Sequence, residues 1–314
     1  QDMLKLLLLS LATGVGLCFI LLHARAMAGE AANRLRVDFH VSGDWWSIPG
    51  VGGAAGAGAL ELEPRRTYDV TGLLREGANA LGVILADGWY AGYLANFANK
   101  ERGTYGYDPN ALVQLEIETD DGETRIVSDD AWRWAEGPWR SADVYNGCTY
   151  DARREVPGWD EPGFDDAEWA AVHRYEPTDA KLEGKYVEPV RVIDRLQPIA
   201  VTEPTPGTYV FDMGQNMVGW AKVRLACRAG QTVTLRHAEM LQDDGTLYVE
   251  NLRAADQIDR FTPAAGGEQE FTPAFTFHGF RYLEVTGLDA RPELSAIEGQ
   301  VLHNAMRHTG RFEC

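Results

Sequence analysis

The sequence predicts an all-β protein: two consecutive antiparallel β-sandwich domains, jelly-roll-like in form, preceded by one hydrophobic, membrane-spanning helix. Short apolar stretches that alternate with polar residues recur between turn residues, which is the pattern of half-buried strands. The 33 glycines and 14 prolines supply frequent turns, and a length of 314 residues suits about two domains. An unbroken apolar run near the N-terminus predicts the helix.

Residues 1–32 form the predicted anchor or signal segment. Met3–Leu22 carries Lys5 as its only charge, and about 20 helical residues cover roughly 30 Å, the hydrocarbon thickness of a bilayer. A cleaved signal peptide is the alternative, because residues 26–28 match a small-x-small cleavage pattern. We favour a membrane anchor through residues 3–22, since a cleaved leader would not remain in the chain. Both alternatives place the rest of the protein in the periplasm or at the cell exterior.

The body of the chain divides into a first sandwich at 33–180 and a second at 181–314, joined by a Pro-rich, charged stretch. The alternation in Leu35–Trp46 predicts a strand, and the glycine- and alanine-rich tract after it predicts a loop. Further strands are predicted at Ala80–Tyr90, Asn110–Asp129, Thr208–Asn216, Gly219–Leu241 and Phe275–Gly287.

Two local elements have specific signals. Gln114–Val127 alternates on both sides of Asp121-Gly122, which predicts a β-hairpin with its turn at those two residues. In the segment FDDAEW, Asp165 or Asp166 is predicted to cap one short helix.

Charge and cysteine content exclude several classes of partner and site. Asp+Glu 47 against Lys+Arg 29 gives a net charge of −18, and the basic residues are scattered, so nucleic acid is not an expected partner. The four cysteines lack the spacing of a zinc knuckle. A disulfide between Cys148 and Cys227 is not expected, because a domain of this size builds a core without one.

Long motifs resemble bacterial α-L-rhamnosidases. TYDVTGLLREGANALGVILADGWYAGYL and YNGCTYDARREVPGWDEPGFDDAEW resemble the N-terminal sugar-binding sandwich of these enzymes. VFDMGQNMVGWAKVRL and FTFHGFRYLEVTG resemble the concanavalin-like sandwich that follows, and LHNAMRHTGRFEC resembles the start of the catalytic barrel. The resemblance implies inverting hydrolysis of α-L-rhamnosides by two acidic residues on an (α/α)6 barrel, which would begin about where this sequence stops.

No catalytic residues are predicted within the sequence itself. The acidic doublets lie in predicted turns, where solvated charges are expected, and neighbouring strand residues point to opposite faces. They are Asp120-Asp121, Asp129-Asp130, Asp165-Asp166 and Asp243-Asp244. The predicted function is therefore that of a non-catalytic, membrane-anchored, extracytoplasmic subunit derived from an α-L-rhamnosidase, with a structural or interaction role in a membrane protein complex. The alternative is a sugar-binding and linker fragment of an active α-L-rhamnosidase whose barrel lies beyond Cys314.

A carbohydrate site is predicted around the DGWY motif, because aromatic faces bind sugar rings and carboxylates or amides bind their hydroxyls. Its residues are Asp87, Trp89, Tyr90, Tyr107, Asp108 and Asn110, with Asn96, Asn99 and Tyr105 on the same loop. The expected ligand is a rhamnose-containing glycan. The resemblance also makes Ca²⁺ a candidate cofactor. Packing of the tryptophan between the sheets is the alternative role.

Two further features concern carboxylates and metals. Asn146 and Cys148 stand where the resemblance implies carboxylates, which weakens a ligand site there. His237 and Glu239 alternate on a predicted strand and His278 lies on another, a set that suggests a metal site. We prefer packing roles for the histidines, because a strand histidine commonly has hydrogen-bond partners, so no metal ligand is assigned.

Overall fold

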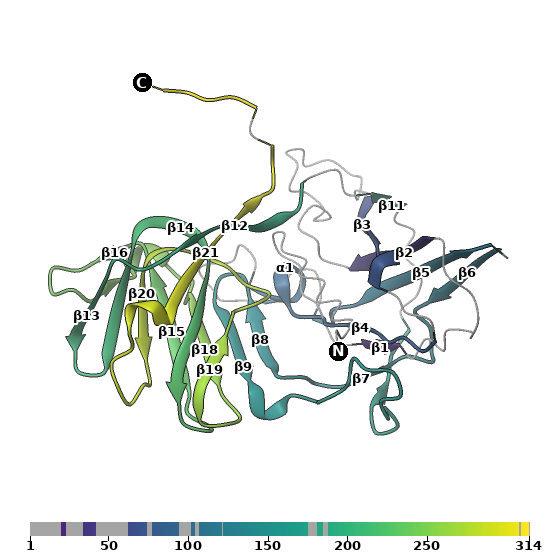
Figure 1. The fold of residues 1–314 in the computed structure, drawn as a ribbon, viewed down its shortest axis with the longest axis horizontal. Helices are drawn as coiled ribbons and strands as arrows, with labels where there is room; N and C mark the ends of the chain where they lie inside the picture. The colour runs from purple at the N-terminus through teal and green to yellow at the C-terminus, as the bar shows by residue number, and fades with distance from the viewer. Residues whose placement is uncertain are drawn as a thin grey trace.

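The computed structural model describes residues 20–22, 34–41, 62–73, 77–93, 102–103, 107–120, 122–174, 181–184, 188–307 and 309–313. Within these ranges the chain is mainly β-strand, which confirms the predicted β class. The single α-helix of the described part is α1 (Gly88–Ala91), one turn long. Figure 1 shows one group of strands built mostly from the C-terminal half and another built from the N-terminal half.

Two sheets form the N-terminal sandwich. The first contains, in spatial order, β11 (Lys181–Gly184), β3 (Leu62–Asp69), β2 (Arg34–Val41), β5 (Ala111–Thr119) and β6 (Gly122–Val127). The second contains β10 (Ala170–Ala171), β7 (Arg133–Trp134), β1 (Ile20–Leu22) and β4 (Leu81–Val83). Leu81 of β4 packs in one buried cluster with Val113 and Leu115 of β5, whereas Leu112 is exposed. Alternate residues of β5 therefore face the core and the solvent.

Strand β1 corrects part of the predicted membrane helix. Ile20–Leu22 pairs antiparallel with both β4 and β7, and these ladders require extended backbone. The predicted helix therefore does not include these three residues, and residues 3–19 lie outside the described residues. Among the described residues, no helix is long and apolar enough to cross a membrane.

Other local predictions are confirmed or shifted. Strand β2 confirms the predicted strand at Leu35–Trp46 over its first part, and the tract after it lies outside the described residues. The β5–β6 hairpin is confirmed, with Thr119 paired to Gly122, so its tip lies one residue before the predicted turn. The predicted strand at Ala80–Tyr90 is reduced to β4. Gly88, with a φ of +51°, leaves the extended region and starts α1.

The predicted helix at FDDAEW is wrong. The carboxylate of Asp165 accepts a hydrogen bond from the Ala167 N–H at 3.1 Å, and the Trp169 N–H donates to the Asp166 carbonyl at 2.9 Å. These bonds close a turn, because an Asp side chain satisfies nearby backbone donors in turns as well as at helix starts. Within the described ranges, the 3₁₀ turns are η2 (Thr71–Leu73), η3 (Ala152–Arg154), η4 (Glu250–Leu252) and η5 (Leu294–Ala296).

A ten-stranded sheet forms the C-terminal half. Its main order is β12 (Val190–Leu196), β21 (Ile297–Asn304), β14 (Thr208–Cys227), β20 (His278–Thr286), β15 (Val233–Ala238), β18 (Ile258–Thr262), β9 (Gly147–Asp151) and β8 (Trp139–Asp143). Strands β13 (Ala200–Thr205) and β19 (Gly267–Phe271) also pair with β14, and β16 (Met240–Leu241) pairs with β17 (Leu247–Tyr248).

Strand β14 holds this sheet around one core. Its first part pairs with β13 and β20, and its last part pairs with β21 and β19, with a register shift between Asp212 and Met217. Gly219 permits the close crossing with β21, because a Cβ there would lie 1.9 Å from the Gln300 carbonyl oxygen. The core includes the fully buried Phe280. One long strand thus replaces the two that we predicted at Thr208–Asn216 and at the start of Gly219–Leu241.

The N-terminal half supplies two strands to the C-terminal sheet. Strand β9 pairs in parallel with β18, and β8 follows as a neighbour of β9. Apart from this pairing and the parallel β3–β11 contact, the pairings among the described strands are antiparallel. The polypeptide therefore passes back and forth between its two halves, while the predicted domain limits at 33–180 and 181–314 stay predictions.

Candidate functional site

Asp87, the first predicted sugar-binding residue, lies directly before α1. Its carboxylate forms an ion pair with the Arg102 guanidinium at 2.8 Å, and Arg102 Nε also donates to the Ala91 carbonyl at 2.9 Å. Burial raises the pKa of Asp87, the Arg102 charge opposes this effect, and the Asp143 carboxylate raises the pKa further. Asp87 and Arg102 thus form a polar corner beside α1, in which the arginine engages part of the Asp87 carboxylate.

The other predicted sugar-binding residues differ in exposure. Trp89 and Tyr90 lie in α1, but their side chains are outside the described part of the structure, as are Asn96, Asn99 and Tyr105. The Tyr107 ring is 67% exposed and can stack on an apolar sugar face. Asp108 is exposed, and the Asn110 amide donates to its carbonyl at 3.4 Å. The structure therefore brings Asp108 and Asn110 together, and a joint site with Asp87 stays a prediction.

Asp143, which the sequence did not single out, joins the two halves of the protein. Its Oδ1 accepts hydrogen bonds from the backbone N–H groups of Tyr145 and Asn146, both at 2.8 Å. Its Oδ2 accepts from the Tyr93 N–H at 2.8 Å, just after α1. Both oxygens of this buried carboxylate are occupied by backbone donors, so Asp143 fixes the β8–β9 turn against the N-terminal sandwich. An Asp two residues before a turn is the only sequence signal for this role.

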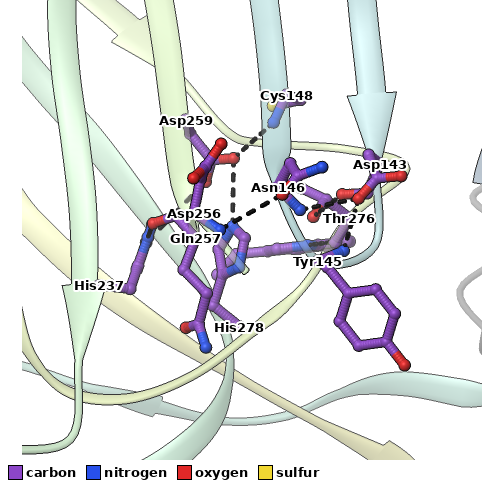
Figure 2. Close-up of polar contacts among 11 residues, drawn as sticks. Asp143, Tyr145, Asn146, Cys148, His237, Asp256, Gln257, Asp259, Thr276 and His278 are labelled. Carbon is purple, nitrogen blue, oxygen red and sulfur yellow. Dashed lines mark hydrogen bonds and ion pairs between the residues drawn. The ribbon is translucent and has the colours of Figure 1, made fainter. Parts of the chain in front are cut away.

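The β8–β9 turn then docks onto the start of β18 (Figure 2). The Gln257 N–H donates to the Tyr145 carbonyl and the Ile258 N–H to the Asn146 carbonyl, both at 3.0 Å. The Asp256 N–H donates to the Asn146 side-chain oxygen at 3.3 Å. Asn146, which replaces an implied carboxylate, therefore has a structural partner.

A buried cluster of ligand-type side chains lies behind this turn. His237 of β15, Asp259 of β18 and His278 of β20 are 0%, 0% and 1% exposed, and one ligand atom from each lies within 4.8 Å of the others. His278 Nε2 is 3.2 Å from Asp259 Oδ1, and His237 Nε2 is 3.9 Å from Asp259 Oδ2. Figure 2 shows Cys148 on the adjoining strand. Its backbone N–H donates to Asp259 Oδ1 at 2.9 Å.

Burial sets the protonation of this cluster. Burial and the nearby His278 lower the pKa of His237 to about 3, although Asp259 and the Gln257 carbonyl oppose this shift. Burial alone would raise the pKa of Asp259, but its interactions with His278, with His237 and with the Cys148 N–H together hold it below its usual range. Burial, with the adjacent Asp259, raises the pKa of the Cys148 thiol well above its usual value. His237 is thus neutral and Asp259 is ionised at neutral pH.

The cluster corrects the third member of the suggested metal set. Strand β15 ends at Ala238, so the alternation that would place Glu239 beside His237 is interrupted. Glu239 is exposed instead and accepts hydrogen bonds from Asn216 at 2.9 Å and Asn251 at 3.2 Å. Asp259 occupies the place expected for Glu239, and residues His237, His278 and Asp259 are the ones that could hold a metal.

The two buried acids of the described ranges are Asp143 and Asp259. Backbone N–H groups occupy both oxygens of Asp143. In Asp259, Oδ1 accepts from the Cys148 N–H and lies 3.2 Å from His278 Nε2, whereas Oδ2 has no hydrogen-bond partner. Of the doublets, Asp129-Asp130 and Asp243-Asp244 are solvent-exposed. Asp143 and Asp259 are enclosed by protein, so neither is accessible to a sugar.

Comparisons with known proteins give consistent matches across the chain. Residues 62–194 match the family model of the "Alpha-L-rhamnosidase N-terminal domain", and residues 202–303 match that of the "Bacterial alpha-L-rhamnosidase concanavalin-like domain". An α-L-rhamnosidase of Streptomyces avermitilis is 47% identical over 254 residues, which cover 79% of this chain and 24% of that protein. One from an Alteromonas species is 42% identical over 230 residues, covering 71% of this chain and 24% of the relative. This chain spans about a quarter of the length of these relatives.

Solved structures show the same likeness. The crystal structure of the Streptomyces avermitilis α-L-rhamnosidase complexed with L-rhamnose aligns with a TM-score of 0.80 and 39% identity, covering 94% of this chain and 29% of that chain. The α-L-rhamnosidase of Aspergillus terreus aligns with a TM-score of 0.82 and 31% identity, covering 96% of this chain and 36% of that one.

Proposed function

Because the chain belongs to the bacterial α-L-rhamnosidase family, we propose that residues 1–314 are the sugar-binding and linker β-domains of an α-L-rhamnosidase and are themselves non-catalytic. The observation that supports this proposal most is the pair of domain matches, 62–194 and 202–303, which are both to the β-domains of the family. The burial of Asp143 and Asp259 also supports it, because neither carboxylate is accessible to a sugar.

The proposed role has two parts. The N-terminal sandwich binds a rhamnose-containing glycan through the polar corner at Asp87 and the exposed ring of Tyr107, with Ca²⁺ as a candidate bridging ion. The C-terminal sheet and the contacts around Asp143 hold this sandwich in a fixed place, so that the glycan is presented to a catalytic domain. The support for the second part is the Asp143 carboxylate, which accepts hydrogen bonds from the backbone N–H groups of Tyr93 on one side and of Tyr145 and Asn146 in the β8–β9 turn on the other.

A membrane-anchored structural subunit was our first expectation from the sequence. The pairing of β1 with β4 and β7 removes Ile20–Leu22 from the helix that this function needs. Anchoring through the remainder of residues 3–22, a membrane protein complex as partner and an extracytoplasmic location stay predictions. They are tested by deleting residues 3–19 and following whether the protein still sediments with membranes.

The proposal is tested with the purified 314-residue chain. We expect no turnover of an aryl α-L-rhamnoside. We expect calorimetry to detect binding of rhamnose in at least one of two conditions, with added Ca²⁺ or with a chelator. Asp87→Asn and Tyr107→Ala should each weaken binding about tenfold, the effect of losing one good polar or stacking contact. Asp194→Asn, an exposed acid on β12, is the matched control and should leave binding unchanged.

Either of two results would contradict the proposal. Turnover of the rhamnoside by the purified chain would show a catalytic site within these residues. Absence of rhamnose binding under both calcium conditions would remove the sugar-binding role, and equal binding by the three variants would place the site elsewhere.

A further inference from the structure

We propose that His237, His278 and Asp259 form a buried structural site for a divalent transition metal, with Zn²⁺ as the best-suited ion. The proposal does not depend on the proposed function. It starts from the three ligand-type side chains that the structure gathers within 4.8 Å from three neighbouring strands, β15, β18 and β20. Imidazole nitrogen, carboxylate oxygen and thiolate sulfur are the ligands that zinc takes in proteins.

The tautomer of His237 directs a lone pair at Asp259. His237 Nδ1 lies 3.0 Å from the Gln257 carbonyl, and a carbonyl only accepts, so Nδ1 carries the proton. In the neutral ring Nε2 then presents a lone pair toward Asp259 Oδ2 at 3.9 Å. Both atoms are buried and lack a hydrogen-bond partner. Two electron-rich atoms that face each other out of solvent are stabilised by a cation between them.

The surroundings of His237 match those of metal ligands. A metal-bound histidine usually donates its second N–H to a carbonyl or carboxylate, which fixes the ring and its tautomer. Gln257 provides that carbonyl, and the same oxygen also accepts from the His237 backbone N–H at 3.1 Å. Gln257 has a φ of +49°, an uncommon conformation for a residue with a side chain. The Gln257 N–H donates to the Tyr145 carbonyl at 3.0 Å, and this bond helps to hold the Gln257 carbonyl in place.

His278 completes the site. His278 Nε2 faces Asp259 Oδ1 at 3.2 Å, and its Nδ1 is buried without a partner, so the ring proton can move to Nδ1 when Nε2 binds the ion. The Cys148 backbone N–H donates to the same Asp259 oxygen at 2.9 Å and holds the carboxylate in place. The Asp259 carboxylate balances one of the two charges of Zn²⁺, which lowers the cost of burying the ion.

The predicted ion is a structural one. Zinc bonds of about 2.0–2.3 Å place neighbouring ligand atoms about 3.3–3.7 Å apart. The pair at 3.2 Å already has this spacing, and the pair at 3.9 Å must close only slightly. Because all three residues are at most 1% exposed, the metal enters during folding. A chelator should therefore remove it only from the unfolded chain.

The test measures metal in the full chain, produced without a histidine tag in medium supplemented with zinc. Elemental mass spectrometry should find about one zinc per chain. The zinc should be retained when the native protein is dialysed against EDTA, and it should be lost when EDTA is added in denaturing urea. Refolding without metal should lower the melting temperature by about 5 °C or more, the effect of removing a ligand present at about 100 times its dissociation constant.

Variants and cobalt locate the metal. His278→Gln and Asp259→Asn should lose the zinc, whereas His173→Gln, an exposed histidine, should keep it. Cobalt-loaded protein should show visible ligand-field bands that His278→Gln removes. If the two variants fail to fold, the cobalt spectrum of the unchanged chain decides the matter.

The proposal is overturned if the unchanged chain contains far less than one transition metal and shows no cobalt bands. It is equally overturned if folded His278→Gln retains full zinc.

Discussion

Gly147 controls how the β8–β9 turn meets β18, and its replacement by alanine should be strongly destabilising. The residue has a φ of +94° and an alanine Cβ would lie 2.2 Å from the Ile258 carbonyl oxygen. Ordinary contact at such a distance begins near 3.4 Å, so the two segments must separate by about 1.2 Å. That movement breaks the bonds from the Ile258 and Gln257 N–H groups, both 3.0 Å long.

The expected loss follows from two effects. Left-handed backbone costs an L-residue about 1 kcal/mol, and two lost hydrogen bonds cost about 1 kcal/mol each. Gly147→Ala should therefore reduce the free energy of unfolding by about 3 kcal/mol. Gly207→Ala is the matched control, because Gly207 has a φ of +77° with nothing within 4 Å of a new Cβ. It should cost only about 1 kcal/mol.

Urea denaturation of both variants, followed by circular dichroism and by tryptophan fluorescence, measures the two losses on the same scale. The steric argument fails if Gly147→Ala is no more destabilising than Gly207→Ala. It also fails if Gly147→Ala leaves the β8–β9 turn in place, which hydrogen exchange of the Ile258 amide would show.

Three further predictions concern other parts of the molecule. The hydrogen bonds from Arg281 hold the pKa of Asp212 below its usual value, so their contribution is present above about pH 4 and is lost as the pH falls through the lowered pKa. Asp212→Asn should reduce the free energy of unfolding by about 1 kcal/mol at pH 7, and urea unfolding should show this loss shrinking as the pH falls below about 4. Trp132 is 1% exposed. Trp132→Ala should reduce the free energy of unfolding by about 4 kcal/mol, and Trp132→Phe should reduce it by about 2 kcal/mol. Equal losses of the two variants in thermal melts would contradict the packing role of this residue. In a variant whose only cysteine is Cys148, a thiol reagent should react at the rate of global unfolding, and immediate reaction would disprove the burial of this thiol.

Elements defined by near neighbours in the sequence could be predicted. The β5–β6 hairpin follows from alternation and a tight turn, and the structure confirms its pairing from Gln114 to Val127. The segment FDDAEW shows the limit of local signals, because an Asp cap serves a turn as well as a helix. The extent of β14 was also missed, since its continuity depends on partners such as β21 that lie far along the chain.

The buried cluster depends on distant contacts even more strongly. Asp259 was not singled out, because its partner Cys148 is 111 residues away and no local pattern joins them. Cys148 was considered as a lost carboxylate and as a disulfide partner of Cys227, but not as a neighbour of the histidines. Glu239 was grouped with His237 on the assumption that the strand continued. The carbohydrate residues could be proposed from their chemistry, but the ion pair of Asp87 with Arg102 requires the folded loop.

The parallel ladder between β9 and β18 joins Arg260 to Thr149 and Phe261 to Tyr150, and it has a consequence for dissecting the protein. Severing the polypeptide near residue 180 would leave the C-terminal piece with β18 as an uncovered edge, and bare edges recruit foreign strands. A recombinant fragment intended to isolate this lobe should therefore begin upstream of Trp139. By the same reasoning, transplanting the N-terminal lobe onto another scaffold would carry an orphaned two-stranded ribbon with it.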